Sequence, residues 1–186
     1  MPEPESDRVI FPPGDLDSDE PPLESDLHRD QIDLPIRLLR WLWQDRQDQD
    51  RQNIHVSGNV TVYYSPQQRK SEDFRGPDFF VVLGAENRTR KSWVVWEEGG
   101  KYPNLIIELL SDSTAKTDRT LKKEIYQDIF RTPDYFWFDP SSLEFQGFDL
   151  VGGPYQPIPP NAQGWLWSQQ LKLFLGIQAK PLRFYP

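Results

Sequence analysis

The sequence predicts an α/β (α+β) protein in which helices flank a mixed central sheet, with a β-rich C-terminal part. Three features support this class: a helical run near the start, several short apolar runs bounded by turn residues, and a second helical run between two of those apolar runs. Strands that alternate with helices in this way are typical of a sheet covered by helices.

The first helix is expected within residues 25–50. Its apolar side chains follow helical spacing at Leu27, Ile32, Ile36, Leu39 and Leu42. Pro35 interrupts this stripe. Either the helix kinks at Pro35, or a new helix begins near Asp33 with the proline in its first turn.

Short strands are expected next. Residues 53–65 alternate in polarity and predict a strand pair, or one strand bent at Gly58. Residues 78–83 form an apolar strand that begins at Asp78, and residues 93–98 form a further strand. Residues 104–111 are the most apolar run and are expected at the centre of the sheet.

The second half of the chain is predicted to begin with a loop and a helix over residues 117–131. A buried aromatic strand follows at residues 134–140, and residues 143–186 contain short strands broken by Gly-Gly, Pro-Pro and Gly164. The segment 135–167 is so rich in aromatic and apolar residues that we expect a homodimer to cover part of it.

Composition narrows the chemistry that is available. There is no cysteine and there are two histidines, which excludes disulfides, thiolate sites and a multi-histidine zinc site. A metal ion would therefore be held by carboxylates, which favour Mg²⁺ or Mn²⁺. The start of the chain lacks the features of a signal peptide, and no run approaches ~18 consecutive apolar residues. We therefore expect a cytoplasmic protein without membrane association.

Charge is distributed unevenly. Residues 1–33 contain eleven acidic and two basic residues, a net charge of −9, whereas the other 153 residues contain eighteen acidic and nineteen basic ones, a net charge of +1. Residues 1–22 are acidic and rich in proline, so we expect a flexible or extended arm. Residues 23–186 are expected to form a single domain.

Two carboxylates stand out because of the strands that carry them. Asp78 begins an apolar strand, and Glu108 lies in the middle of the most apolar one. An unpaired charge in such a place costs several kcal/mol, so Glu108 needs a metal, a cation or a proton. The alternatives are a turn-capping role for Asp78 and an ion pair with an arginine for Glu108.

The helix after Glu108 adds a lysine. At ~100° per residue, the apolar stripe is formed by Leu121, Ile125, Tyr126 and Ile129. Asp118 and Lys122 fall inside this stripe, whereas Lys123 falls outside it on the expected solvent side. The alternative is an exposed pair between Asp118 and Lys122 at the end of the stripe.

These motifs, in this order, resemble the Uma-two family of restriction endonuclease-like proteins in the PD-(D/E)XK superfamily. The resemblance is dense over residues 77–140 and weaker from His28 and toward the C-terminus. The matching residues are Pro77, Asp78, Glu108, Ser111, Ser113, Thr114, Asp118, Lys122, Tyr126, Tyr135, Trp137, Asp139 and Pro140. The superfamily usually places its lysine two residues after the acid, but position 110 is Leu, so the resemblance implies that Lys122 supplies the amine.

The resemblance implies a restriction-endonuclease-like fold and metal-dependent hydrolysis of DNA phosphodiesters. Asp78, Glu108 and the carbonyl of Leu109 would hold Mg²⁺ or Mn²⁺, and Lys122 would act on the attacking water. Supporting roles are expected for Glu24, His28 and Asp118, and the alternative for His28 is a surface or capping position. Two basic loops are candidate DNA contacts, although their charges could equally be ordinary solvated ones: Arg69, Lys70 and Arg75, and Arg88, Arg90 and Lys91.

Two other functions compete with a nuclease. A catalytically silent homologue could keep the fold and act as a homodimeric interaction protein. A sugar-processing enzyme could use the carboxylate pair, but it would leave Lys122 without a role.

Overall fold

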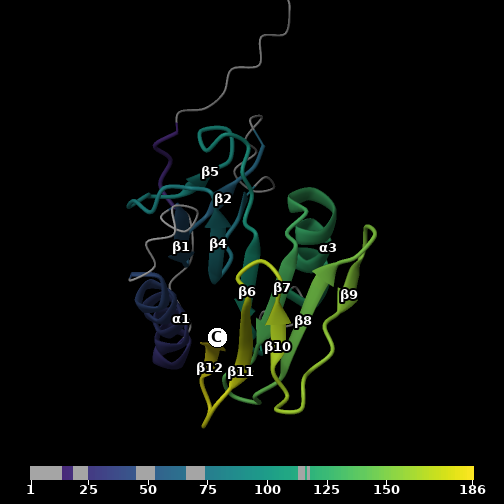
Figure 1. Ribbon diagram of the computed structural model, residues 1–186. Coiled ribbons are helices and arrows are strands. Elements are labelled where there is room, and N and C mark those ends of the chain that lie inside the picture. Colours follow the sequence, from purple (N-terminus) through teal and green to yellow (C-terminus); the bar gives the residue numbers. More distant parts are fainter. Residues whose placement is uncertain (1–13, 19–24, 45–52, 66–73, 113–115, 117) are drawn as a thin grey trace, which may run out of the picture.

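The computed structural model describes residues 14–18, 25–44, 53–65, 74–112, 116 and 118–186 (Figure 1). Its largest element is a six-stranded sheet in the order β1-β4-β6-β7-β8-β9. β6 and β7 run parallel and the other neighbours antiparallel, which confirms the predicted mixed sheet. The strands are β1 (Ile54–Gly58), β4 (Phe79–Leu83), β6 (Leu105–Leu109), β7 (Asp134–Phe138), β8 (Phe145–Leu150) and β9 (Tyr155–Pro157).

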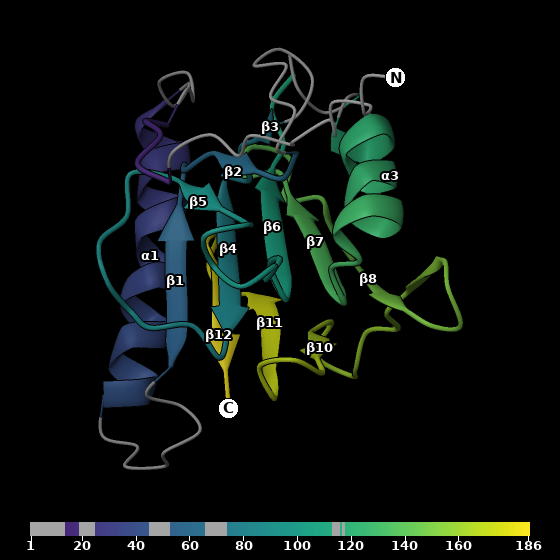
Figure 2. The same ribbon diagram turned by 90° about the horizontal axis from the view of Figure 1, so that it is seen from above.

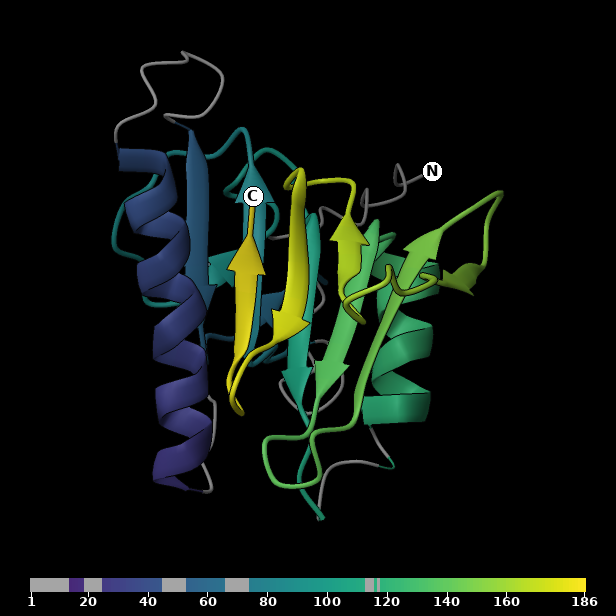
Figure 3. The same ribbon diagram turned by 60° about the horizontal axis from the view of Figure 1, so that its bottom comes forward.

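One face of this sheet is covered by helix α1 (Asp26–Gln44) and by a three-stranded antiparallel sheet (Figure 3). That smaller sheet consists of β10 (Leu166–Ser168), β11 (Leu173–Ile177) and β12 (Leu182–Tyr185). Alternate residues of the main strands, such as Val81 and Ile107, form one core cluster with Leu39 of α1 and Leu175 of β11. The side chain of Gln31 exchanges two hydrogen bonds with the backbone of Leu182, which ties α1 to β12.

The opposite face carries the second helix and a small sheet formed by β3 (Phe74–Arg75), β2 (Val62–Tyr63) and β5 (Trp93–Val94) (Figure 2). The helix has three segments: η2 (Asp118–Lys122), α3 (Lys123–Ile125) and η3 (Tyr126–Phe130). A second core cluster joins Val62 and Trp93 to Ile106, Tyr126 and Tyr135. The candidate site lies on this face.

Helix α1 passes through Pro35 without ending, and Pro35 is buried. A new helix near Asp33 is therefore not formed. The break predicted at Gly58 is present, because β1 and β2 belong to different sheets. A Cβ atom at Gly58 would lie 2.4 Å from Cγ2 of Ile32, so glycine lets α1 pack closely on β1.

The aromatic residues that suggested a dimer surface are mostly inside the chain. Tyr135, Phe136 and Phe138 are fully buried, and Phe148 and Tyr155 are nearly so. The homodimer stays a prediction, but this segment no longer supports it, because the β10–β12 sheet and the second helix cover its aromatic side chains.

Part of the acidic arm packs against the domain. Ser18 Oγ accepts a hydrogen bond from the Thr61 amide at 3.0 Å, and the hydroxyl groups of Tyr63 and Ser92 donate to the carbonyls of Asp17 and Leu16 at 2.8 and 2.6 Å. Residues 16–18 are thus hydrogen-bonded to the domain beside β2 and β5. Whether the arm as a whole is flexible or extended stays a prediction. The rest of the arm lies outside the described residues.

Candidate active site

Asp78 and Glu108 face each other across two antiparallel strands. β4 pairs with β6 so that Phe79 lies opposite Ile107, and one further step places Asp78 opposite Glu108. Opposed residues in antiparallel strands project from the same face. The two carboxyl groups therefore meet on the face that carries the second helix.

The carboxyl group of Glu108 is fully buried and held at both oxygens. The hydroxyl of Tyr126 donates to Oε1 at 2.5 Å, and the ammonium of Lys122 lies 3.1 Å from Oε2. Burial raises the pKa of Glu108 to about 8, and the negative charge of Asp78 adds to this rise, whereas Lys122 and Tyr126 oppose it. A buried carboxyl group with a displaced pKa is typical of a functional site.

Asp78 connects β4 to the end of β6. Its Oδ2 accepts a hydrogen bond from the backbone amide of Leu109 at 2.7 Å, and its side chain is partly exposed. Asp78 is therefore the more accessible carboxylate of the two.

The helix presents Lys122 to the site, but the predicted apolar stripe is only half right. Ile125 and Tyr126 are buried as predicted, whereas Leu121 and Ile129 are 49% and 47% exposed. Phe130 is buried instead, on the same side as Tyr126. The reason is the winding: η2 and η3 are π-helical, with hydrogen bonds to the fifth residue instead of the fourth, which rotates side chains relative to an α-helix.

Lys123 is not on the solvent side as predicted. Its ammonium lies 3.7 Å from the centre of the Phe148 ring and 5.7 Å from that of Trp137. Burial lowers the pKa of Lys123. The lysine packs on the aromatic surface of β7 and β8, and among the described residues it forms no ion pair with Asp78 or Glu108.

His28 lies at the start of α1, close to the end of β6. Its Nε2 donates to the carbonyl of Leu110 at 3.2 Å, and its Nδ1 is 2.8 Å from the Ser25 hydroxyl. His28 thus supports the strand end from the opposite layer. Glu24 lies outside the described residues, as does the side chain of Asp118, although its backbone begins η2.

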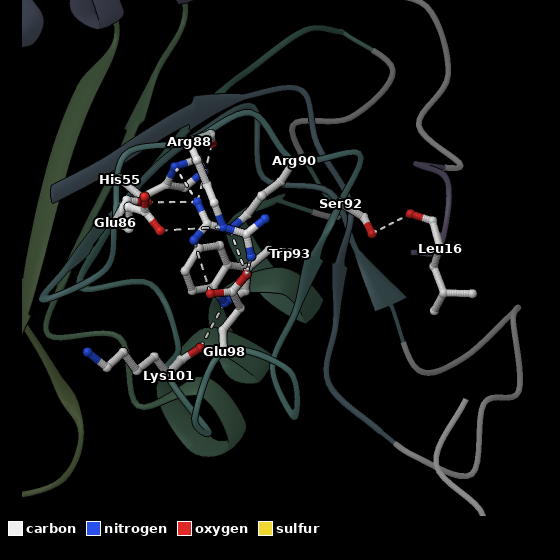
Figure 4. A network of polar contacts seen from close by, with 9 residues as sticks. All are labelled: Leu16, His55, Glu86, Arg88, Arg90, Ser92, Trp93, Glu98 and Lys101. Atoms are coloured by element: carbon white, nitrogen blue, oxygen red, sulfur yellow. Dashed lines mark hydrogen bonds and ion pairs between the residues drawn. The ribbon is translucent and has the colours of Figure 1, made fainter. Parts of the chain in front are cut away.

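The candidate DNA contacts separate into different environments. Arg69, Lys70 and the side chain of Arg75 lie outside the described residues. Arg90 is 5% exposed and its guanidinium donates to both oxygens of Glu98, at 2.5 and 3.1 Å (Figure 4). Arg90 is therefore a structural residue, and we do not expect it to contact DNA.

Arg88 and Lys91 are half or more exposed. Nη2 of Arg88 lies 3.2 Å from Oε1 of Glu98, which Arg90 also binds. Nζ of Lys91 lies 3.4 Å from Oδ1 of Asp17 in the arm. Both side chains remain accessible at the surface.

Sequence reasoning missed the role of Tyr126 as a hydrogen-bond donor to Glu108. Its spacing of four from Lys122 was the available signal, because residues four apart lie on one side of a helix. The sequence places Tyr126 in the apolar stripe and in the family motif, and neither predicts this hydrogen bond.

The two carboxylates suit a divalent cation. They converge at one point, and a cation would relieve both the burial of Glu108 and its repulsion with Asp78. Within the described ranges, no group of three or more His, Cys, Asp or Glu side chains is placed to hold a metal. A backbone carbonyl, water or substrate oxygen would therefore have to complete the coordination.

Comparison with known proteins identifies a family and a similar solved structure. The family described as "Uma2: Putative restriction endonuclease" matches residues 1–181. The structure is similar to a crystal structure described as a putative nuclease belonging to DUF820 from Anabaena variabilis ATCC 29413. The TM-score is 0.56 at 10% identity, covering 82% of this chain and 77% of that one.

That structural similarity confirms the predicted fold class. No curated protein matches the chain, and no helix in the described part is both long and apolar enough to cross a membrane. Because the family match extends over nearly the whole sequence, the chain belongs to the Uma2 family of putative restriction endonucleases.

Proposed function

We propose that the protein is a metal-dependent endonuclease that hydrolyses phosphodiester bonds of DNA. One observation carries the proposal: Asp78 from β4, Glu108 from β6 and Lys122 from the second helix meet on one face, with Lys122 bonded to Glu108 at 3.1 Å. Membership of the Uma2 family supports it.

In this proposal Asp78, Glu108 and the backbone carbonyl of Leu109 hold Mg²⁺ or Mn²⁺. A bound divalent cation supplies positive charge beside the scissile phosphate and lowers the pKa of a coordinated water. The residues contribute the oxygen ligands that such hard cations prefer. The hydrogen bond from the Leu109 amide fixes one oxygen of Asp78 at the end of β6.

Lys122 serves as the catalytic lysine. Its ammonium reaches Glu108 from a side chain that is 20% exposed, so it contacts both the buried carboxyl and the solvent side of the site. From there it orients the attacking water, or accepts its proton, and offsets negative charge that develops on phosphate. Tyr126 positions Glu108 from the buried side.

A catalytically silent homologue is the second candidate. Glu108 is fully buried, and both of its oxygens already have donors inside the protein. Such a closed network would also be stable without a metal or a substrate. In that case Lys122 and Tyr126 would serve only to neutralise Glu108.

Cleavage assays separate the two candidates. Wild type, Asp78→Asn, Lys122→Met and Lys123→Met would be incubated with plasmid and single-stranded DNA, with Mn²⁺, Mg²⁺ or EDTA. We expect metal-dependent cleavage that falls ~100-fold or more in Asp78→Asn and Lys122→Met, the scale of losing an electrostatic or acid–base group. Lys123→Met is the matched control and should cleave normally. A folded wild type that cleaves nothing with either metal would support the silent homologue.

A further inference from the structure

A polar pocket lies beside β1, the edge strand of the main sheet, away from Asp78 and Glu108. Its volume is about 360 Å³, and its lining residues are Arg40, His55, Val56, Ser57, Asn87, Arg88, Thr89 and Arg90. His55 pairs with Val82, four residues along β4 from Asp78. At the usual rise per residue, the pocket is ~13 Å along the strand from the candidate active site.

The floor of the pocket is a rigid network around Arg90 (Figure 4). Besides its bonds to Glu98, the guanidinium donates to the carbonyl of Glu86 at 2.8 Å and lies 4.9 Å from the Trp93 ring centre. The indole of Trp93 is itself fixed by a 2.8 Å bond to the carbonyl of Lys101. Arg90 is therefore fixed in place, and it orients the groups around it.

Arg90 contacts only one of the two ring nitrogens of His55 in this network. His55 is 5% exposed, and Nη1 of Arg90 lies 3.1 Å from its Nδ1. Arginine has only donors, so Nδ1 must accept and Nε2 carries the proton. Burial, together with the charge of Arg90, lowers the pKa of His55 to about 4, so the ring is neutral. The Nε2–H group forms no hydrogen bond with any described residue, and His55 lines the pocket.

The rest of the lining is also rich in donors. Arg40 and Arg88 bring positive charge, and Ser57, Asn87 and Thr89 bring hydroxyl and amide groups. No Asp or Glu lies among the described lining residues. Glu98 bonds to both Arg88 and Arg90, and a carboxylate oxygen of Glu86 lies 3.9 Å from Nε of Arg88, which leaves three guanidinium groups against two carboxylates.

We propose that this pocket binds a phosphate group. Guanidinium groups bind phosphate oxygens through charge-assisted hydrogen bonds, and a buried neutral imidazole N–H adds a directional donor. The group could belong to a nucleic acid strand or be free phosphate. Its binding does not depend on the proposed nuclease activity, since neither Asp78 nor Glu108 lines the pocket.

Calorimetric titration with inorganic phosphate tests the proposal, at constant ionic strength against chloride and without metal. The variants are Arg40→Gln and Arg88→Gln, both on accessible side chains. The matched control is Arg29→Gln, an arginine on the same helix as Arg40 that is 61% exposed and lies outside the pocket. Each pocket variant should weaken binding about tenfold or more, the scale of one hydrogen bond to a charged group. Arg29→Gln should bind phosphate as wild type does.

Nitrogen NMR of the His55 ring gives an independent readout. Phosphate should shift the Nε2 resonance, while chloride at equal ionic strength should leave it in place. If phosphate binds no better than chloride, or if Arg40→Gln and Arg88→Gln bind phosphate like wild type, the proposal is overturned.

Oligonucleotides distinguish the source of the phosphate. In the Asp78→Asn background with EDTA, 5′-phosphorylated and 5′-hydroxyl single strands would be compared by anisotropy, with and without Arg88→Gln. A terminal phosphate is indicated if only the phosphorylated strand depends on Arg88. An internal phosphate is indicated if both strands do, and free phosphate if neither does while inorganic phosphate still binds. A protein that binds phosphate but never cleaves DNA would refute the nuclease and leave the pocket standing.

Discussion

The buried carboxyl group of Glu108 should make folding stability depend on pH in a way that Glu108→Gln removes. The pKa of Glu108 rises from the model-compound value of 4.5 to about 8 in the folded chain, with burial as the largest cause. Between these values the folded state keeps a proton that the unfolded state has lost. The stabilisation is therefore complete below 4.5 and is lost as the pH rises through 8.

The size of the effect follows from the shift. Each pH unit inside this window changes the free energy of unfolding by about 1.4 kcal/mol, so the window from pH 5 to 8 corresponds to about 4 kcal/mol. That is a large part of the 5–15 kcal/mol that holds an ordinary domain together. Glutamine has nearly the same shape as glutamate and cannot ionise. The unfolding free energy of Glu108→Gln should therefore lack this fall between pH 5 and 8.

The assay is urea unfolding of metal-free wild type and Glu108→Gln at pH 5, 6, 7 and 8. We expect the difference in unfolding free energy between the two proteins to move steadily in favour of the variant as the pH rises. Glu124→Gln, which removes an exposed carboxylate on the second helix, is the control and should track wild type. Parallel curves for wild type and Glu108→Gln would refute the argument, because they would mean that Glu108 ionises as easily in the folded chain as in the unfolded one.

Other consequences concern the same site and the arm. Lys123→Met should lose its cation–π contacts and cost ~0.5–2 kcal/mol of unfolding free energy, measured by urea titration, while it still cleaves DNA. Lys122→Met should abolish cleavage. If Lys123→Met abolished cleavage and Lys122→Met cleaved normally, Lys123 and not Lys122 would be the catalytic lysine. Tyr126→Phe removes a hydrogen-bond donor to buried Glu108 and should cost ~1–3 kcal/mol of unfolding free energy. In titrations with Mn²⁺ at a series of pH values, the affinity of this variant should begin to rise at a higher pH than that of wild type, because the lost hydrogen bond lowers the pKa of Glu108. An unchanged pH profile would argue against this hydrogen bond. Deleting residues 1–18 removes the hydrogen bonds that Leu16, Asp17 and Ser18 accept from the domain, worth ~1–3 kcal/mol together, and should lower the thermal midpoint by several degrees. An unchanged midpoint would show that water replaces the arm.

Several features of this chain could be predicted from its sequence because local chemistry decides them. Apolar runs bounded by turn residues placed β4, β6 and β7, and helical spacing placed α1 and the second helix. A glutamate inside the most apolar strand identified Glu108, since burying a carboxyl group has a cost that some partner must offset. The spacing of residues along the second helix predicted that Lys122 faces the sheet, and Lys122 does contact Glu108, although the same spacing was wrong for Leu121, Ile129 and Lys123.

Other features depended on contacts between distant segments. The register of β4 on β6 places Asp78 opposite Glu108, and a shift of one residue would have put the two carboxyl groups on opposite faces. The π-helical winding of η2 and η3 turned Tyr126 toward Glu108 and Lys123 onto an aromatic surface.

The phosphate pocket was beyond prediction for the same reason. Arg40, His55 and Arg88 belong to separate segments with no spacing motif in common, and they meet only because α1, β1 and the loop after β4 pack together. Sequence patterns report which side of one helix or strand is apolar. Only tertiary packing decides which charged groups from different elements share a pocket, because their separation in space is unrelated to their separation along the chain.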